Sequence, residues 1–250
     1  DDLVDKFFRL RYFAYVCKIF RNDLSLGGNV EHPKQTQESM AKRVMRFSEL
    51  KDKGIPIMFI DSMLPGHERM NYAVIGDTAS ENPDYSIQRA ITDPHNYQIG
   101  MGWAPPGSGP AWHTHDYIES FFILSGPWDF YWGNEDDPKK SEGVLRLNEW
   151  DMISLPPGMW RRFEYVGDRI GWFFAILESH QVFEGKDPYW SPVVEQQAAD
   201  NGYQADERGK MVHPEDYEDQ KTQQTEKLLR IFKERMGVDL KDFQPPKTSE

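Results

Sequence analysis

The pattern of apolar and polar residues divides the chain into three zones. In the first, from residue 1 to about residue 24, large apolar residues recur at helical spacing with charged residues between them. This pattern predicts an amphipathic helix, and the turn residues at 26–29 end it. A second, polar helix is predicted over residues 35–50.

The second zone, from about residue 55 to residue 179, consists of short runs rich in aromatic and β-branched residues. Glycine, proline, asparagine and aspartate separate these runs. The runs predicted to be strands cover residues 57–61, 71–76, 97–103, 119–126, 128–133, 144–147, 152–155, 161–166 and 171–177. Many short strands with turn signals between them are typical of an antiparallel sandwich or barrel.

The third zone begins after Ser179 and is polar. Near its end the spacing of apolar residues predicts an amphipathic helix from about residue 214 to residue 236, with Gly237 as its stop. Its predicted apolar stripe consists of Leu228, Leu229, Ile231 and Phe232. The predicted organisation is therefore an N-terminal helical extension (1–54), a β-barrel (55–180) and a polar C-terminal extension with a terminal helix (181–250).

Composition and charge narrow the function classes. With 41 acidic against 29 basic residues the net charge is −12, so the chain repels phosphate backbones and we expect no nucleic-acid partner. No run of 18 apolar residues occurs, so we expect no membrane span. Cys17 is the single cysteine, which excludes an intramolecular disulfide and suits a reducing compartment. We therefore expect a cytoplasmic protein.

The candidate chemistry lies in the sequence His113-Thr114-His115 and in Glu119, four residues further on. Side chains alternate along a strand, so these three side chains are predicted to point to one face. Two imidazoles and one carboxylate form a facial set with open positions, which suits Fe(II) best and also Mn, Ni, Co or Zn. Taken alone, a His-x-His pair is also compatible with two solvated surface histidines.

The spacing around these residues resembles the first motif of the cupin superfamily. That motif reads Gly, five residues, His-x-His, three or four residues, Glu, six residues, Gly, and it is matched by Gly107, His113, His115, Glu119 and Gly126. The resemblance covers about residues 98–177. It implies a mainly β fold, a cupin-type double-stranded β-helix or jelly-roll barrel with flanking N- and C-terminal helices. It also implies that His113, His115 and Glu119 bind one divalent metal ion.

The second motif of that superfamily is only partly present. Pro156 and Gly158 match it, but Arg161 replaces the histidine that usually completes the metal shell. Arginine has no lone pair to donate, so Arg161 is not a ligand. Two interpretations remain open: Arg161 clamps a substrate carboxylate or enolate beside the metal, or metal affinity is lost and Arg161 pairs with Glu119. His180 is either a replacement ligand or a surface histidine.

Aromatic residues next to the two motifs suggest a pocket. Trp112 and Trp160 each adjoin a motif residue, so we predict that they bind substrate as walls favouring an aromatic or conjugated molecule. Packing in the core is the alternative role for tryptophans in this region. The candidate hydroxyl donors are Tyr117, Tyr131 and Tyr165. Tyr131 and Arg161 are the predicted catalytic residues.

The resemblance implies a metal-dependent enzyme that acts on a small anionic or phenolic molecule. An iron-dependent dioxygenase is the preferred prediction, because open positions on Fe(II) accept substrate and dioxygen together. A lyase, isomerase or hydrolase, with the metal as Lewis acid and a tyrosine or histidine as base, is the alternative. A non-enzymatic small-molecule binder is a third possibility. Cupins frequently pair, and the aromatic N-terminal helix has a face to cover, so we expect a homodimer.

Overall fold

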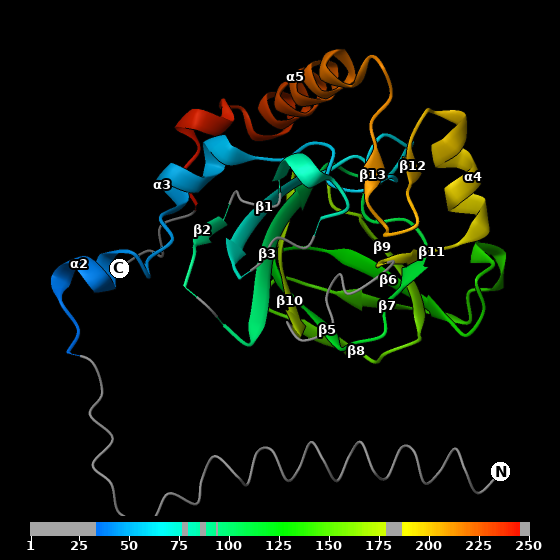
Figure 1. Ribbon diagram of the computed structural model, residues 1–250, viewed down its shortest axis with the longest axis horizontal. Helices are drawn as coiled ribbons and strands as arrows, with labels where there is room; N and C mark the ends of the chain where they lie inside the picture. Colours follow the sequence, from blue (N-terminus) through cyan, green and yellow to red (C-terminus); the bar gives the residue numbers. More distant parts are fainter. Residues whose placement is uncertain (1–33, 77–79, 86–88, 94, 179–186, 246–250) are drawn as a thin grey trace, which may run out of the picture. The chain divides into compact units, whose positions relative to one another are not determined.

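The structure is a computed structural model that describes residues 34–76, 80–85, 89–93, 95–178 and 187–245 (Figure 1). The predicted helix at residues 1–24 and the candidate ligand His180 lie outside the described residues. The predicted helix at 35–50 is two short helices, α2 (Gln37–Ala41) and α3 (Phe47–Leu50), with a break between them.

The strands form two main sheets. The six-stranded sheet has the order β2-β1-β3-β10-β5-β8, and the five-stranded sheet has the order β11-β4-β9-β6-β7. The bounds in the first are β2 Arg89–Ile91, β1 Met70–Ile75, β3 Tyr97–Ala104, β10 Gly171–Glu178, β5 Glu119–Ser125 and β8 Met152–Leu155. Those in the second are β11 Tyr189–Trp190, β4 His113–Thr114, β9 Trp160–Tyr165, β6 Trp128–Gly133 and β7 Gly143–Leu147. The strand pairs within these two sheets are antiparallel, except that β1 and β2 are parallel. The predicted mainly β fold is confirmed.

One predicted strand is wrong. Residues 57–61 form turns, and the backbone there is bonded to side chains instead of a neighbouring strand. The backbone N–H of Ile60 donates to Glu81 Oε2, and that of Phe59 donates to Ser62 Oγ. The apolar residues of this segment are nevertheless buried, because they pack in a small core beside the barrel.

The inner faces of the two sheets pack against each other. Phe121 of β5 and Phe173 of β10 contact Phe163 of β9, with ring centroids 4.4 Å and 5.5 Å away. Phe130 of β6 stacks on Phe163 at 4.6 Å. Because successive side chains on a strand alternate, the same strands present a second set of residues to the outside.

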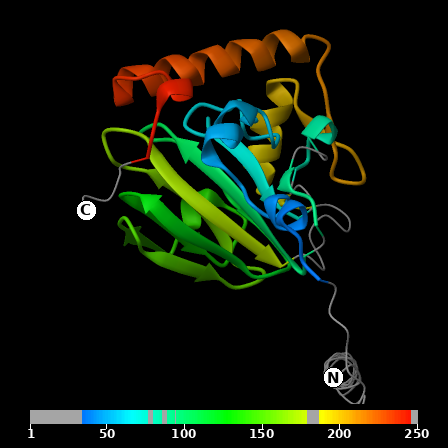
Figure 2. The ribbon, with the colours of Figure 1, turned by 90° about the vertical axis from the view of Figure 1, so that its left-hand side faces the viewer.

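The helix α5 (Tyr217–Met236) packs against one end of the six-stranded sheet, and Figure 2 shows it running across the top of the barrel. Of the predicted apolar stripe, only Leu228 and Phe232 are fully buried, packed against Trp103 and Trp172. They are four residues apart, one helical turn, and their burial contributes about 1.5–3 kcal/mol each. The helix ends at Gly237, which takes the left-handed conformation with φ 74°.

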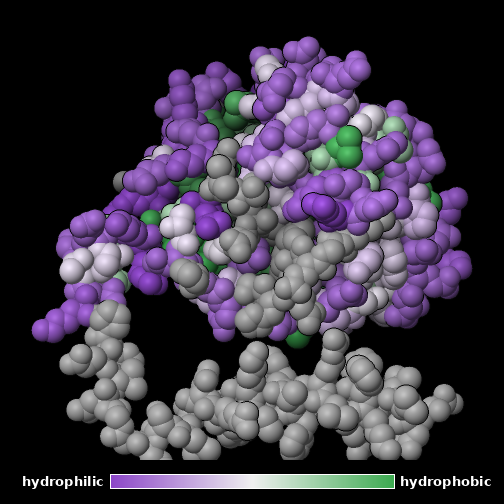
Figure 3. Space-filling model, viewed as in Figure 1, coloured by the Kyte–Doolittle hydropathy of each residue, from purple (hydrophilic) through white to green (hydrophobic). Residues whose placement is uncertain are grey.

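The polar C-terminal segment contributes to the barrel as well as covering it. Strand β11 pairs with β4, and α4 (Pro192–Asp200) packs beside it. The remaining elements are β12 Gln204–Ala205, β13 Met211–Val212 and the 3-10 helices Lys51–Lys53, Pro83–Tyr85, Pro138–Lys140 and Leu240–Asp242. Polar residues cover most of the coloured face in Figure 3. Among the described helices, none has the length and apolar character needed to cross a membrane.

Candidate metal centre

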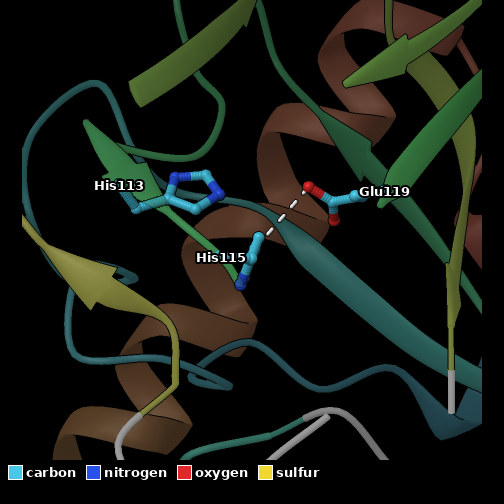
Figure 4. A group of neighbouring side chains, drawn as sticks. All are labelled: His113, His115 and Glu119. Atoms are coloured by element: carbon cyan, nitrogen blue, oxygen red, sulfur yellow. Dashed lines mark ion pairs between the residues drawn. The ribbon is translucent and has the colours of Figure 1, made fainter. Parts of the chain in front are cut away.

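The three predicted ligands come together in the structure. One possible ligand atom from each of His113, His115 and Glu119 lies within 4.8 Å of the other two, and all three residues are buried (Figure 4). The geometry differs from the prediction of one continuous strand. Strand β4 ends at Thr114, and the chain then crosses to the other sheet, where Glu119 begins β5. The carboxylate therefore approaches the two imidazoles from the facing sheet.

Hydrogen bonds orient both imidazoles toward the carboxylate. His113 Nδ1 donates to the carbonyl oxygen of Ala111, and His115 Nδ1 donates to Asp187 Oδ1, both at 2.7 Å. A proton on Nδ1 leaves the lone pair on Nε2, and His115 Nε2 lies 3.6 Å from Glu119 Oε2. Burial, together with the charge of Arg161, lowers the pKa of His113 well below its ordinary value, so this imidazole stays neutral. Neutral imidazoles and an ionised carboxylate are the forms that bind metal ions.

Arg161 is the buried partner of Glu119. Its side chain is fully buried, its Nη2 donates to Glu119 Oε2 at 3.0 Å, and its Nη1 donates to the carbonyl oxygen of Met159 at 3.0 Å. The register places Arg161 opposite His113 on the adjacent strand. Arg161 is absent from the lining of the pocket described below. The structure shows the ion pair of Arg161 with Glu119, and the role of Arg161 as a substrate clamp stays a prediction.

A pocket opens beside the three ligands. Its cavity volume is about 90 Å³. His113, His115 and Glu119 form part of its wall. Much of the remaining wall is apolar and includes Phe121, Phe163, Phe173, Leu177 and Trp190. The site therefore combines three possible metal ligands with a largely apolar wall.

Three predicted site residues lie elsewhere. Trp112 and Trp160 directly precede His113 and Arg161, so the alternation of side chains sends them to the opposite face of the sheet. Trp112 is buried in the core beside α4, and Trp160 packs against that core. Tyr131 donates to Glu164 Oε1 at 2.9 Å, and its ring lies 3.7 Å from the guanidinium of Arg162. None of the three lines the pocket beside the ligands, and their predicted roles stay predictions.

Asp187, Tyr117 and Trp190 surround the ligands, and of these the sequence analysis named only Tyr117. Asp187 binds His115 through Oδ1 and accepts a hydrogen bond from the Tyr117 hydroxyl through Oδ2, at 2.7 Å in both cases. The Tyr117 ring stacks on His115 with centroids 4.8 Å apart, and the Trp190 ring lies 5.2 Å from His113. Tyr117 was one of three candidate hydroxyl donors. Asp187 carries no sequence signal, because it is 72 residues away from His115.

Asp187→Asn is expected to weaken divalent metal binding by roughly 10–100-fold, the usual cost of losing an outer partner of a ligating histidine. The amide keeps the size of the side chain but removes the charge that aligns His115. Equilibrium dialysis with Zn²⁺ measures the effect. Asp116→Asn is the matched control, because Asp116 is an exposed carboxylate bonded to Tyr189. Equal affinities in the two variants would show that Asp187 has no part in orienting His115.

Glu81 lies behind the site and gives a prediction on pH. It accepts hydrogen bonds from the Ile60 backbone N–H at 2.8 Å and from Trp190 Nε1 at 2.7 Å. Burial raises the pKa of Glu81 from its ordinary value of 4.5 to about 8, with smaller contributions from Asp61 and Asp187. Between pH 4.5 and about 8, Glu81 is protonated in the folded protein and ionised in the unfolded chain. The free energy of unfolding therefore falls as the pH rises through this range. Glu81→Gln is expected to flatten this dependence in thermal unfolding between pH 5 and 8; an unchanged slope would contradict the assignment.

The structure requires glycine at both glycine positions of the first motif, for a different reason at each. Gly107 takes φ 77°, a left-handed conformation that side chains other than glycine rarely adopt. At Gly126 an added Cβ would lie 2.8 Å from the backbone nitrogen of Glu149, so the close approach of two segments requires glycine. Both glycines flank the segment that carries the three ligands, and they fix the turns at its two ends.

Comparisons with known proteins give only weak structural similarities. No family model matches the chain, and no curated protein matches it. Among solved structures, a cupin-2 domain protein from Rhodospirillum rubrum is 11% identical with a TM-score of 0.37, covering 52% of this chain and 73% of its own. A cupin 2 conserved barrel domain protein from Rhodopseudomonas palustris is 11% identical with a TM-score of 0.36, covering 54% and 79%. A DMSP lyase from Ruegeria pomeroyi DSS-3 is 19% identical with a TM-score of 0.31, covering 38% and 43%.

These similarities are too low to carry an argument about activity. The fold is decided by the chain itself: two facing sheets, a first motif whose glycines make the turns, and three ligands brought together across the sheets. The described barrel of this chain is a cupin-type double-stranded β-helix.

Proposed function

We propose that the protein is a metal-dependent enzyme that acts on a small organic oxyanion, with Fe(II) as its metal and dioxygen as its second substrate. The observation that carries this proposal is the buried set of His113, His115 and Glu119, whose ligand atoms lie within 4.8 Å of one another on the wall of a pocket. Both imidazoles are bonded through Nδ1, which leaves each Nε2 lone pair free for a metal ion beside the Glu119 carboxylate.

The donor set fits Fe(II). Two imidazole nitrogens and one carboxylate are the facial triad of non-heme iron oxygenases, and the set leaves positions open. When bound, Fe(II) would supply the redox chemistry with dioxygen that amino-acid side chains cannot perform. Mn, Ni, Co and Zn suit the same donors less specifically.

The charges around the site favour an anionic substrate. Glu119 and Asp187 are acidic and Arg161 is basic, so the buried groups near the ligands carry a formal charge of −1 together. Arg69, a buried arginine on the pocket wall, is neutralised by a two-pronged ion pair with Asp61 at 2.8 Å and 3.1 Å. A divalent ion would leave one positive charge in a water-poor pocket, and a carboxylate, enolate or phenolate would neutralise it.

The surrounding residues have positioning roles in this proposal. Asp187 holds His115, and Arg161 holds Glu119. Burial and the neighbouring charge of Asp187 raise the pKa of Tyr117 above its ordinary value, so its hydroxyl keeps its proton and acts as a donor. A tyrosine of this kind is a poor general base, which weighs against a proton-abstracting lyase that would rely on Tyr117.

Oxygen uptake tests the proposal. The protein is loaded with Fe(II) without oxygen, mixed with small carboxylates, enolisable ketones and phenols, and then exposed to a known amount of dioxygen. We expect one compound class to consume dioxygen in a fixed ratio to product, and we expect His113→Ala to abolish this uptake. Product formed without oxygen consumption would indicate a lyase, isomerase or hydrolase. Binding without turnover for every class would indicate a non-enzymatic binder.

A further inference from the structure

Small residues form a floor on the pocket side of the six-stranded sheet. Ala73, Gly100 and Ala175 lie side by side on neighbouring strands, since Gly100 pairs with Ala73 on one side and with Ala175 on the other. All three line the pocket. A Cβ added at Gly100 would have only one neighbour within 4 Å, the backbone oxygen of Tyr72 at 3.7 Å. Space above this floor is therefore open, and its size depends on the absence of side chains.

A second row crosses the same face next to the floor. Leu177 pairs with Glu119 on one side and with Gln98 on the other, so Gln98 and the metal ligand Glu119 lie on one face, two strands apart. Neighbouring strands are roughly 4.8 Å apart, which puts about 10 Å between the two backbones. Both residues line the pocket. The pocket thus has a polar group at each end of this row and apolar surface between them.

Gln98 has an unsatisfied polar atom. Gln98 is only 4% exposed, and its side-chain oxygen Oε1 has no hydrogen-bond partner among the described residues. A buried acceptor without a partner lowers stability, so such groups in a folded protein call for an explanation. Gln98 is one of the residues that line the pocket, and a hydrogen-bond donor on a bound ligand would satisfy this oxygen.

We propose that Gln98 and the small-residue floor form the specificity end of the ligand site. The ligand is a small oxyanion whose charged group lies at the metal end and whose apolar body lies over Ala73, Gly100 and Ala175. Its opposite end carries a hydroxyl or N–H group that donates to Gln98. This inference rests on the proposed function, which assigns the metal ion to one end of the pocket. It adds Gln98 as a second polar group and the apolar surface between Gln98 and the metal ligands.

Two probes that differ by one hydroxyl test the inference. The full-length protein is loaded with Co²⁺, and benzoate and 4-hydroxybenzoate are titrated while the visible absorption of the bound cobalt is followed. We expect the native protein to bind 4-hydroxybenzoate tighter than benzoate by on the order of tenfold, the effect of one net hydrogen bond. Gln98→Leu keeps the side-chain size but removes the acceptor, so it is expected to bind both probes equally.

Controls separate the subsite from the metal site and from folding. Cobalt content of Gln98→Leu is expected to equal that of the native protein, with a Tm that is equal or higher, because an unsatisfied buried group is removed. Gly100→Val, which fills the floor, is expected to weaken both probes while leaving cobalt content unchanged. Three results would overturn the inference but not the proposed function. The preference for 4-hydroxybenzoate could persist in Gln98→Leu, or it could be absent in the cobalt-loaded native protein. The third result is that neither probe binds to the cobalt-loaded native protein. A native protein that takes up no cobalt would overturn the proposed function and the inference with it.

Discussion

Replacing His113 by alanine is expected to reduce bound divalent metal from one ion per chain to almost none. The change removes one of three ligands, and its effect on affinity should exceed the roughly 10–100-fold cost of losing an outer partner. The barrel should remain folded, since His113 belongs to β4 through backbone pairing with β9 and β11. Elemental analysis after dialysis measures the metal, and circular dichroism checks the fold.

A second histidine provides the control for this experiment. His67 is half-buried, and its ring bonds the carbonyl oxygen of Gly109, but it lies outside the group of ligands. His67→Ala should therefore keep a full complement of metal. If the His113 variant retains one tightly bound ion per chain, the assignment of the ligands is wrong.

Replacing Arg161 by methionine is expected to lower the free energy of unfolding of the metal-free protein by about 3–5 kcal/mol, the usual cost of removing one partner of a buried ion pair. Methionine keeps most of the side-chain volume. The loss of stability therefore comes mainly from the unpaired charge of Glu119 and less from a cavity. Glu119 is also held in place by this contact, at 3.0 Å. Metal affinity should therefore fall as well, in contrast to a substrate clamp, whose removal would leave the metal untouched.

Urea unfolding with and without Zn²⁺ measures both effects. We expect the metal to restore part of the lost stability, because a cation beside Glu119 supplies the missing positive charge. Arg162→Met is the matched control: the next residue on β9 points to the opposite face and pairs with Glu164 at 3.0 Å at a partly exposed site. Exposed pairs contribute about 0–1 kcal/mol. Equal losses in the two variants would contradict the role assigned to Arg161.

Much of the barrel could be predicted from sequence because its strands have a strong local signature. Runs such as Trp128–Gly133 and Gly171–Glu178 are aromatic and β-branched, bounded by turns, and pair as predicted strands. The segment 57–61 carries the same apolar signature but forms turns. Its burial comes from α4 and neighbouring loops, whose positions depend on long-range packing.

In the candidate site, too, local sequence predicted some features, and others depend on how distant segments pack. His113, His115 and Glu119 could be predicted because their spacing matches a motif, although the crossing between sheets was not foreseen. Trp112 and Trp160 were assigned to the pocket by adjacency in sequence, and strand alternation, applied to them as it was to the histidines, would have placed them on the other face.

Asp187 could not be predicted because nothing local links it to His115. It lies in the polar C-terminal segment, and only the pairing of β11 with β4 brings it back to the barrel. Gln98 could not be predicted for a related reason. Its proposed role depends on the strand register, which places it two strands from Glu119, and a single glutamine in a strand does not indicate that register.

The most direct test is a crystal structure of the metal-loaded protein with X-ray data collected on both sides of the absorption edge of the metal. We expect one strong anomalous peak per chain, within about 2.0–2.2 Å of Nε2 of His113, Nε2 of His115 and a carboxylate oxygen of Glu119. Arg161 should still contact Glu119, and Asp187 should still contact His115. A peak at other residues, or no peak in crystals soaked in excess metal, would contradict the account.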